Sequence, residues 1–336
     1  MSKGLGFARM ALLAGLAIIP GFAADAPAQT RSCWLRDLSS PTTSNIYALC
    51  EQGSVWFSGD GGTTWAPKET GAKEPLRAMV FLDANRGLAV GDAGLIMSTT
   101  DASKTWTAVK SGTEKKLMDV SFAGNTGWVV GYNGLILHTA DGGRTWSEQK
   151  SGTTQTIESV FFLDAQHGWA IGWAGTILRT ADGGKTWEAI KTDAATWSLS
   201  SVYFRDLQNG WIVGFAGQII RSSDGGKTWK AQTSPVKGWL TSVAFDKLNR
   251  GWITHDDGFL VSEDGGETWK IIKTGGRYFL SKLARVNDTV WALGQSTVLR
   301  QTGPGLEWKR VEGLTLDKSM SLGSSVQAPP GGSELK

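Results

Sequence analysis

The sequence predicts an all-β protein: a seven-bladed β-propeller of four-stranded antiparallel blades that share one turn motif. Three observations support this fold class. A motif recurs at a period near 40 residues, each period holds four strand-like segments, and the composition is rich in glycine and tryptophan, with 44 Gly and 17 Trp among 336 residues. Four strands per unit at this period are typical of propeller blades. We therefore predict one propeller over residues 34–314.

The recurring motif is Asp-Gly-Gly-x-Thr-Trp, in which the tryptophan follows the aspartate by five residues. It is complete from Asp141 to Trp146. The seven copies begin at residues 60, 101, 141, 182, 224, 264 and 303. The last copy is degenerate, because Gly303 stands where the aspartate should be. Intervals of 39 to 42 residues, six times running, predict seven blades.

Each period also contains three further strand-like segments in a fixed order. In the third period an alternating apolar segment covers 117–122, a Gly-Trp-Val-Val-Gly segment covers 127–131, and a third segment covers 134–138. Glycine-rich turns separate them. One such sheet cannot bury both of its faces, so neighbouring blades must stack. We expect the tryptophans of the motif and of the Gly-Trp segments to be wedged between blades.

The first period is irregular at its start. Residues 34–38 and 46–50 occupy the positions of its first and second strands. If these strands pair antiparallel, Cys33 lies opposite Cys50, and in an oxidising compartment the two could form a disulfide that closes the first blade. Two unrelated buried thiols are the alternative.

The two ends of the chain lack the repeat. Lys3 and Arg9 precede an apolar run of about 15 residues, shorter than the ~20 residues of a membrane-spanning helix. With small residues following, this pattern predicts a cleaved signal peptide at 1–24 and export of the mature protein; a retained anchor is the alternative. We expect an N-terminal extension at 25–33 and a disordered tail at 315–336.

Charge and motif content argue against several functional classes. The net charge is +3, two of which come from the first 24 residues, and no run of Lys or Arg suggests nucleic-acid binding. The three histidines and two cysteines lack metal-ligand spacing. No phosphate loop, dinucleotide fingerprint or Gly-x-Ser-x-Gly segment occurs. We predict no metal, no cofactor and no catalytic residues.

The extended motif, Ser/Thr-x-Asp-Gly-Gly-x-Thr-Trp, resembles the Asp-box, also called the bacterial neuraminidase repeat. An aspartate in such a turn accepts hydrogen bonds from its own loop, so we interpret the Asp-box as structural rather than as a calcium or sugar site. Over residues 34–312, the combination of Val-x-Phe, Gly-Trp-x-Val-Gly and Asp-box is similar to the photosystem II stability/assembly factor family. The irregular first period and the degenerate seventh Asp-box depart from that pattern.

The resemblance implies a seven-bladed propeller that assists a newly made membrane protein. Its implied partner is a membrane protein or an assembly intermediate of a membrane-protein complex. Relatives also occur in bacteria that do not photosynthesise, so the resemblance leaves the host open. The implied location is the periplasm, or a compartment like the thylakoid lumen if the host is photosynthetic.

A partner-binding face is predicted from positions that break the repeat. Turns between second and third strands share a face with the connections between blades, opposite the Asp-boxes. Five aromatic residues are expected on this face: Tyr132, Trp173, Trp197, Phe215 and Trp239. Clustered exposed aromatics are typical of interaction surfaces; the alternative is that they fold over the rim and cap the core. Arg77 and Arg277 lie near the same face and could grip acidic groups.

The leading prediction is therefore a non-catalytic exported propeller that binds protein as an assembly or stability factor. A carbohydrate-binding or sialidase/glycosidase-like Asp-box propeller, in which the aromatics stack on sugar rings, is the alternative. Sialidases need a tyrosine nucleophile and an arginine triad, but the chain has four Tyr and no Phe-Arg-Ile-Pro segment. Other glycosidases need two carboxylates facing across a cleft, whereas most acidic residues here recur with the repeat.

Overall fold

The computed structural model describes residues 33–256, 258–273, 278–295, 297–302, 305–312, 314 and 325–326. All of them belong to one compact unit, Arg31–Lys336. The predicted signal peptide, the N-terminal extension as far as residue 32 and Gly303 of the seventh Asp-box lie outside the described residues. So does the predicted tail, apart from 325–326.

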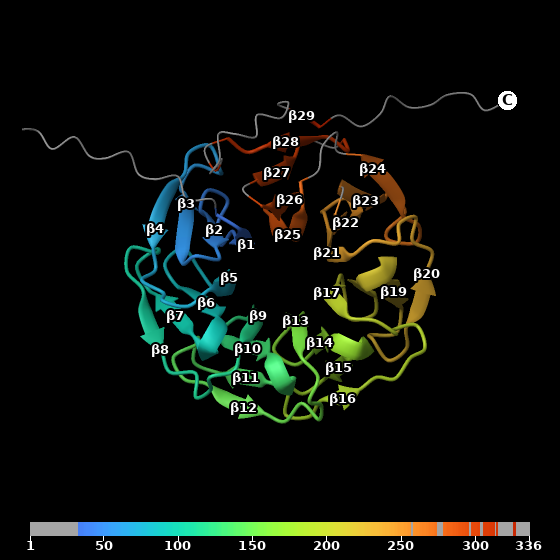
Figure 1. The fold of residues 1–336 in the computed structure, drawn as a ribbon, viewed down its shortest axis with the longest axis horizontal. Helices are drawn as coiled ribbons and strands as arrows, with labels where there is room; N and C mark the ends of the chain where they lie inside the picture. Colours follow the sequence, from blue (N-terminus) through green and yellow to red (C-terminus); the bar gives the residue numbers. More distant parts are fainter. Residues whose placement is uncertain are drawn as a thin grey trace, which may run out of the picture. The chain divides into compact units, whose positions relative to one another are not determined.

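Seven antiparallel sheets follow one another around a central axis (Figure 1). Blade 1 contains β1 (Leu35–Ser39), β2 (Ile46–Cys50), β3 (Ser54–Ser58) and β4 (Ala66–Glu69). Blade 2 contains β5 (Leu76–Phe81), β6 (Gly87–Gly91), β7 (Ile96–Thr99) and β8 (Thr107–Val109). Blade 3 contains β9 (Leu117–Ala123), β10 (Thr126–Gly131), β11 (Ile136–Thr139) and β12 (Ser147–Gln149). Blade 4 contains β13 (Ile157–Phe162), β14 (Gly168–Gly172), β15 (Ile177–Thr180) and β16 (Glu188–Ala189).

The remaining blades repeat the pattern. Blade 5 contains β17 (Leu199–Phe204), β18 (Gly210–Gly214), β19 (Ile219–Ser222) and β20 (Lys230–Gln232). Blade 6 contains β21 (Leu240–Phe245), β22 (Gly251–His255), β23 (Gly258–Ser262) and β24 (Lys270–Lys273). Blade 7 contains β25 (Leu280–Val286), β26 (Thr289–Gly294), β27 (Thr297–Gln301) and β28 (Trp308–Arg310), and a fifth strand, β29 (Ser325–Val326), pairs with β28.

The predicted fold class is confirmed. Every blade has its strands in sequence order, and the first strand of each blade lies nearest the axis (Figure 1). Neighbouring inner strands contact one another around the ring, and β1 contacts β25 to close it. Four one-turn 3-10 segments connect second and third strands: η1 (Asp92–Gly94), η2 (Tyr132–Gly134), η3 (Trp173–Gly175) and η4 (Phe215–Gly217). In the described part of the chain, no helix has the length and apolarity needed to span a membrane.

Aromatic side chains join neighbouring blades, as the sequence predicts. The Trp169 indole of blade 4 stacks on Phe204 of blade 5, with ring centroids 3.5 Å apart, and its Nε1–H donates to the Gly225 carbonyl at 3.1 Å. The Asp-box residue Trp229 meets the same Phe204 ring edge-on at 5.7 Å. Trp128 and Phe162 form the equivalent stack between blades 3 and 4. These stacked aromatic rings bury the faces of neighbouring blades, which one sheet cannot bury alone.

Each Asp-box aspartate organises its own turn. Asp141 Oδ1 accepts from the backbone N–H groups of Arg144 and Thr145 at 2.9 and 3.0 Å, and Oδ2 accepts from the Thr145 hydroxyl at 2.6 Å. Hydrogen bonds from the threonine four residues later hold the pKa of Asp60 and Asp141 below the ordinary range and lower that of Asp101 to about 2. The Asp-boxes therefore act as structural turns.

This geometry predicts that the Asp-boxes carry part of the acid sensitivity of the fold. A carboxylate whose pKa is depressed by folding contributes stability above its unfolded pKa, near 3.9, and that stability is lost as pH falls toward the folded pKa. We expect the thermal midpoint to fall between about pH 5 and about pH 2. In the triple variant D141N/D182N/D224N the midpoint should be lower at neutral pH and should decline less steeply. Parallel declines in the variant and the wild type would contradict this role.

The first blade is closed by a disulfide between Cys33 and Cys50, whose Cα atoms are 5.5 Å apart. The register pairs Leu35 with Cys50, which places the residue before β1 beside the end of β2. A bridge between Trp34 and Gln295 joins the same segment to blade 7. A loop of this size stabilises by roughly 3 kcal/mol on a chain-entropy model. The disulfide thus fixes the point at which the two ends of the ring meet.

Candidate functional site

All seven inner strands carry a β-bulge at the same place. In β13, Ile157 pairs with Gly172 and Ser159 with Ile171, so Glu158 between them is skipped. The other inner strands skip their equivalent residue in the same way. The skipped residues, here called the bulge ring, are Arg36, Arg77, Met118, Glu158, Ser200, Thr241 and Ser281. Bulges re-aim side chains, and here they aim one from each blade at the axis.

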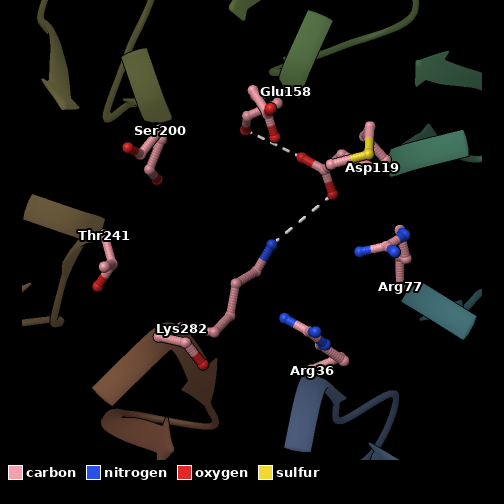
Figure 2. A pocket seen from close by; sticks show the side chains of 11 residues that line it. Arg36, Arg77, Asp119, Glu158, Ser200, Thr241 and Lys282 are labelled. Atoms are coloured by element: carbon pink, nitrogen blue, oxygen red, sulfur yellow. Dashed lines mark hydrogen bonds and ion pairs between the residues drawn. The ribbon is translucent and has the colours of Figure 1, made fainter. Parts of the chain in front are cut away.

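The bulge ring lines an axial pocket of about 180 Å³, shown in Figure 2. The next residues along four of the strands, Asp119, Ser159, Ser201 and Lys282, also line it. In Figure 2, Lys282 of blade 7 extends across the axis toward Asp119 of blade 3. The bulges thus gather charged and hydroxyl groups from all seven blades in one place.

Lys282 and Asp119 line this pocket and form an ion pair across it. Lys282 Nζ lies 3.6 Å from Asp119 Oδ1. Burial alone would lower the pKa of Lys282, but the carboxylates of Asp119 and Asp37 raise it above its ordinary value. Asp119 Oδ2 also accepts from the Ser159 hydroxyl at 2.9 Å and the Val160 N–H at 3.1 Å. This cluster therefore links neighbouring blades and is structural.

The two arginines of the bulge ring are paired within the chain. Arg36 Nη2 lies 2.7 Å from Glu51 Oε1. Arg77 forms a two-bond ion pair with Asp92 of η1, which also accepts Lys116 Nζ at 3.1 Å. The sequence predicts that Arg77 and Arg277 could grip acidic groups of a partner. The structure instead shows Arg77 engaged by Asp92, and Arg277 lies outside the described residues.

The predicted aromatic residues gather on one face in two groups. Tyr132 and Trp173 begin η2 and η3, and their ring centroids are 6.2 Å apart. Phe215 begins η4 and lies 6.0 Å from Trp197 and 5.9 Å from Trp239. Trp173, Trp197, Phe215 and Trp239 are 44%, 53%, 45% and 48% exposed. We call these five side chains the aromatic arc. Four of them face solvent rather than capping the core.

A second pocket of about 480 Å³, here called the rim pocket, joins the two groups. Trp173 and Trp239 both line it, together with Arg36 and Glu158 of the bulge ring. The Trp173 Nε1–H donates to Glu158 Oε1 at 2.5 Å, and the Trp239 Nε1–H donates to the Ser200 hydroxyl at 2.6 Å. These bonds hold both indoles at the mouth of the axial pocket.

Sequence reasoning found the arc but missed the bulge ring. A signal was present: each inner strand begins with an aliphatic residue followed by two variable positions, as in Ile157-Glu158-Ser159 and Leu280-Ser281-Lys282. Charged residues there interrupt an otherwise apolar strand. The described residues contain no group of three or more side chains placed to hold a metal ion.

These features define a class of protein: an Asp-box propeller whose axial pocket opens beside an exposed aromatic arc. The chain belongs to a photosystem II assembly factor-like family, whose model, described as photosynthesis system II assembly factor YCF48, matches residues 69–152 and 146–234. This family is one of assembly factors rather than of known enzymes.

Two solved structures show the same fold at low sequence identity. The structure of YCF48 bound to D1 peptide superposes with a TM-score of 0.67 at 18% identity, covering 81% of this chain and 92% of that one. YCF48 from Cyanidioschyzon merolae has a TM-score of 0.57 at 20% identity, covering 71% and 85% of the two chains. No curated protein matches the sequence.

Proposed function

We propose that this protein is an exported, non-catalytic assembly factor that binds a segment of a membrane protein on its aromatic arc. The observation that carries the proposal is the arc itself, with four half-exposed aromatic side chains beside a pocket. Monomeric proteins rarely leave such surfaces uncovered unless they bind something. Family membership and the D1 peptide bound to YCF48 support a polypeptide partner.

The proposed location is the periplasm, or a compartment like the thylakoid lumen in a photosynthetic host. The pattern of the first 24 residues supports export. The disulfide between Cys33 and Cys50 is consistent with an oxidising compartment.

A glycan is the second candidate ligand. The rim pocket combines two tryptophans with the hydroxyls of Ser200 and Thr241, and sugars are commonly bound by aromatic faces and hydroxyl groups. The peptide is favoured because the family consists of assembly factors.

Photo-crosslinking in the native host tests the proposal. A benzoyl-phenylalanine at Phe215 places the probe on the arc, and the same group at Lys227, in the Asp-box turn of blade 5, controls for the opposite face. We expect position 215 to capture one membrane protein that position 227 does not. Equal labelling at both positions, or none, would argue against a binding role for the arc, and glycan binding would then be tested.

A further inference from the structure

Charge pairing leaves one carboxylate of the rim pocket unmatched. Arg36 is neutralised by Glu51, Arg77 by Asp92 and Lys282 by Asp119, all within the chain. Glu158, by contrast, accepts a hydrogen bond from the neutral Trp173 indole and takes part in none of the ion pairs between described residues; the charges of Arg77 and Lys116 act on its carboxylate without forming an ion pair with it. Glu158 is therefore the carboxylate of the rim pocket that is open to an ion pair with a ligand, whereas Arg36 in the same pocket is already paired with Glu51.

The surroundings of Glu158 favour the binding of a positively charged group beside its carboxylate. Its carboxylate is partly buried, and burial raises the pKa of Glu158, although the Trp173 hydrogen bond and the charges of Arg77 and Lys116 oppose the rise. A positive group placed beside a half-buried carboxylate restores the stabilisation that burial removes.

The walls of the rim pocket suit a long side chain. Trp173 and Trp239 are both about half exposed and both line the pocket, and their indole N–H groups are already bonded to Glu158 and Ser200. Their remaining surface is aromatic carbon. Such surfaces attract cations and pack against the methylene stems of lysine and arginine.

We infer that the rim pocket takes a lysine or arginine side chain of the bound polypeptide, with its charge at Glu158 and its methylene stem against Trp173 and Trp239. This inference rests on the proposed function, because it specifies which residue of the partner enters the site. The partner residue is thus positively charged, whereas the sequence led us to expect that Arg77 and Arg277 bind acidic groups of the partner.

Three capped hexapeptides of alanine and leucine, differing only in a central lysine, norleucine or glutamate, test the inference. Titration into the full-length protein is followed by the Trp173 indole N–H resonance, assigned with W173F. We expect the lysine peptide to bind at least about tenfold more tightly than the norleucine peptide, because both side chains carry four aliphatic carbons and only lysine adds charge.

Two glutamine variants locate the effect. In E158Q, which keeps an acceptor for Trp173, the advantage of lysine over norleucine should disappear. In E148Q, where an exposed glutamate 3.7 Å from Lys115 is changed, the advantage should remain. Equal binding of all three peptides, tighter binding of the glutamate peptide, no binding, or an unchanged preference in E158Q would overturn the inference. If crosslinking at Phe215 still captures a partner, only the inference fails; if that is lost as well, the proposed function fails too.

Discussion

Trp211→Ala is expected to destabilise the propeller by about 3–5 kcal/mol, the range found when buried aromatic side chains are truncated. Trp211 is fully buried between blades 5 and 6. Its ring centroid lies 4.3 Å from that of Phe245, and its Nε1–H donates to the Gly266 carbonyl at 3.0 Å. Alanine would remove this ring contact between the two blades and one of the two hydrogen bonds to that carbonyl, which also accepts from Gln232 Nε2 at 2.8 Å.

The environment of Trp211 makes collapse around the cavity difficult. The guanidinium groups of Arg205 and Arg221 lie 5.3 and 5.5 Å from its ring centroid. Without the indole these two charges would face a cavity rather than an aromatic surface. Trp211→Phe keeps part of the ring and loses the hydrogen bond, so we expect a smaller loss of about 1–2 kcal/mol.

Chemical denaturation followed by far-ultraviolet circular dichroism measures these losses. Trp197→Ala is the matched control, because it truncates the same side chain where it is 53% exposed. We expect W197A to cost less than about 1 kcal/mol, in line with surface substitutions. If W197A and W211A shift the midpoint equally, the position between blades does not explain the stability of the fold.

The sequence predicted the seven-bladed propeller because its clearest motif, the Asp-box, recurs at a regular interval. The Asp-box forms a local turn closed by its own side chains, as at Asp141, so its spacing counts blades without any knowledge of packing. The same alignment placed Cys33, just before the first strand, opposite Cys50 at the end of the second; it left the choice between a disulfide and two separate thiols open, and the structure has the disulfide. Local motifs were therefore sufficient for the architecture.

The bulge ring could not be predicted in this way. A bulge is a shift in register between two strands, and strict alternation would have placed Glu158 or Arg77 on a single face of a regular strand. Ion pairing was equally hidden. Asp92 follows Arg77 by 15 residues and meets it because the bulge and η1 lie at the same end of blade 2. The sequence therefore placed Arg77 near the predicted binding face without revealing that Asp92 pairs with it.

The arc was predicted as a face but not as two groups around a pocket. Turn position alone placed Tyr132, Trp173 and Phe215 at the same end of three blades. The bond from Trp173 to Glu158 depends on the bulge, so the rim pocket became visible only in the structure. The part of the site that depends on register was the part that sequence reasoning missed.

Gly134→Ala is expected to destabilise the fold by more than about 3 kcal/mol, because it combines backbone strain with a collision that repacking cannot relieve. Gly134 ends η2 with φ at +68°, a conformation that favours glycine. A Cβ there would overlap the carbonyl oxygen of Thr153, in the connection between blades 3 and 4, and would lie 2.9 Å from Ser151 Oγ. Backbone atoms would have to separate to admit it.

Gly152→Ala is the matched control, one residue from that same carbonyl. Its φ of +78° is equally unfavourable to alanine, but no atom lies within 4 Å of the added Cβ. We expect a loss of about 1 kcal/mol, the strain of the left-handed conformation alone. The difference between the two denaturation midpoints measures the collision. If G134A were no less stable than G152A, the turn and the connection would not be in rigid contact.

The same contact recurs where the aromatic arc is built. A Cβ at Gly175 or Gly217 would overlap the carbonyl oxygen of Ala195 or Val236, and these lie in the connections that carry Trp197 and Trp239. At each blade that contributes to the arc, the 3-10 segment therefore packs tightly against the connection that leads to the next blade. Since a rigid surface loses less conformational entropy on binding, G217A should weaken capture of the partner at Phe215 more than its loss of stability alone explains.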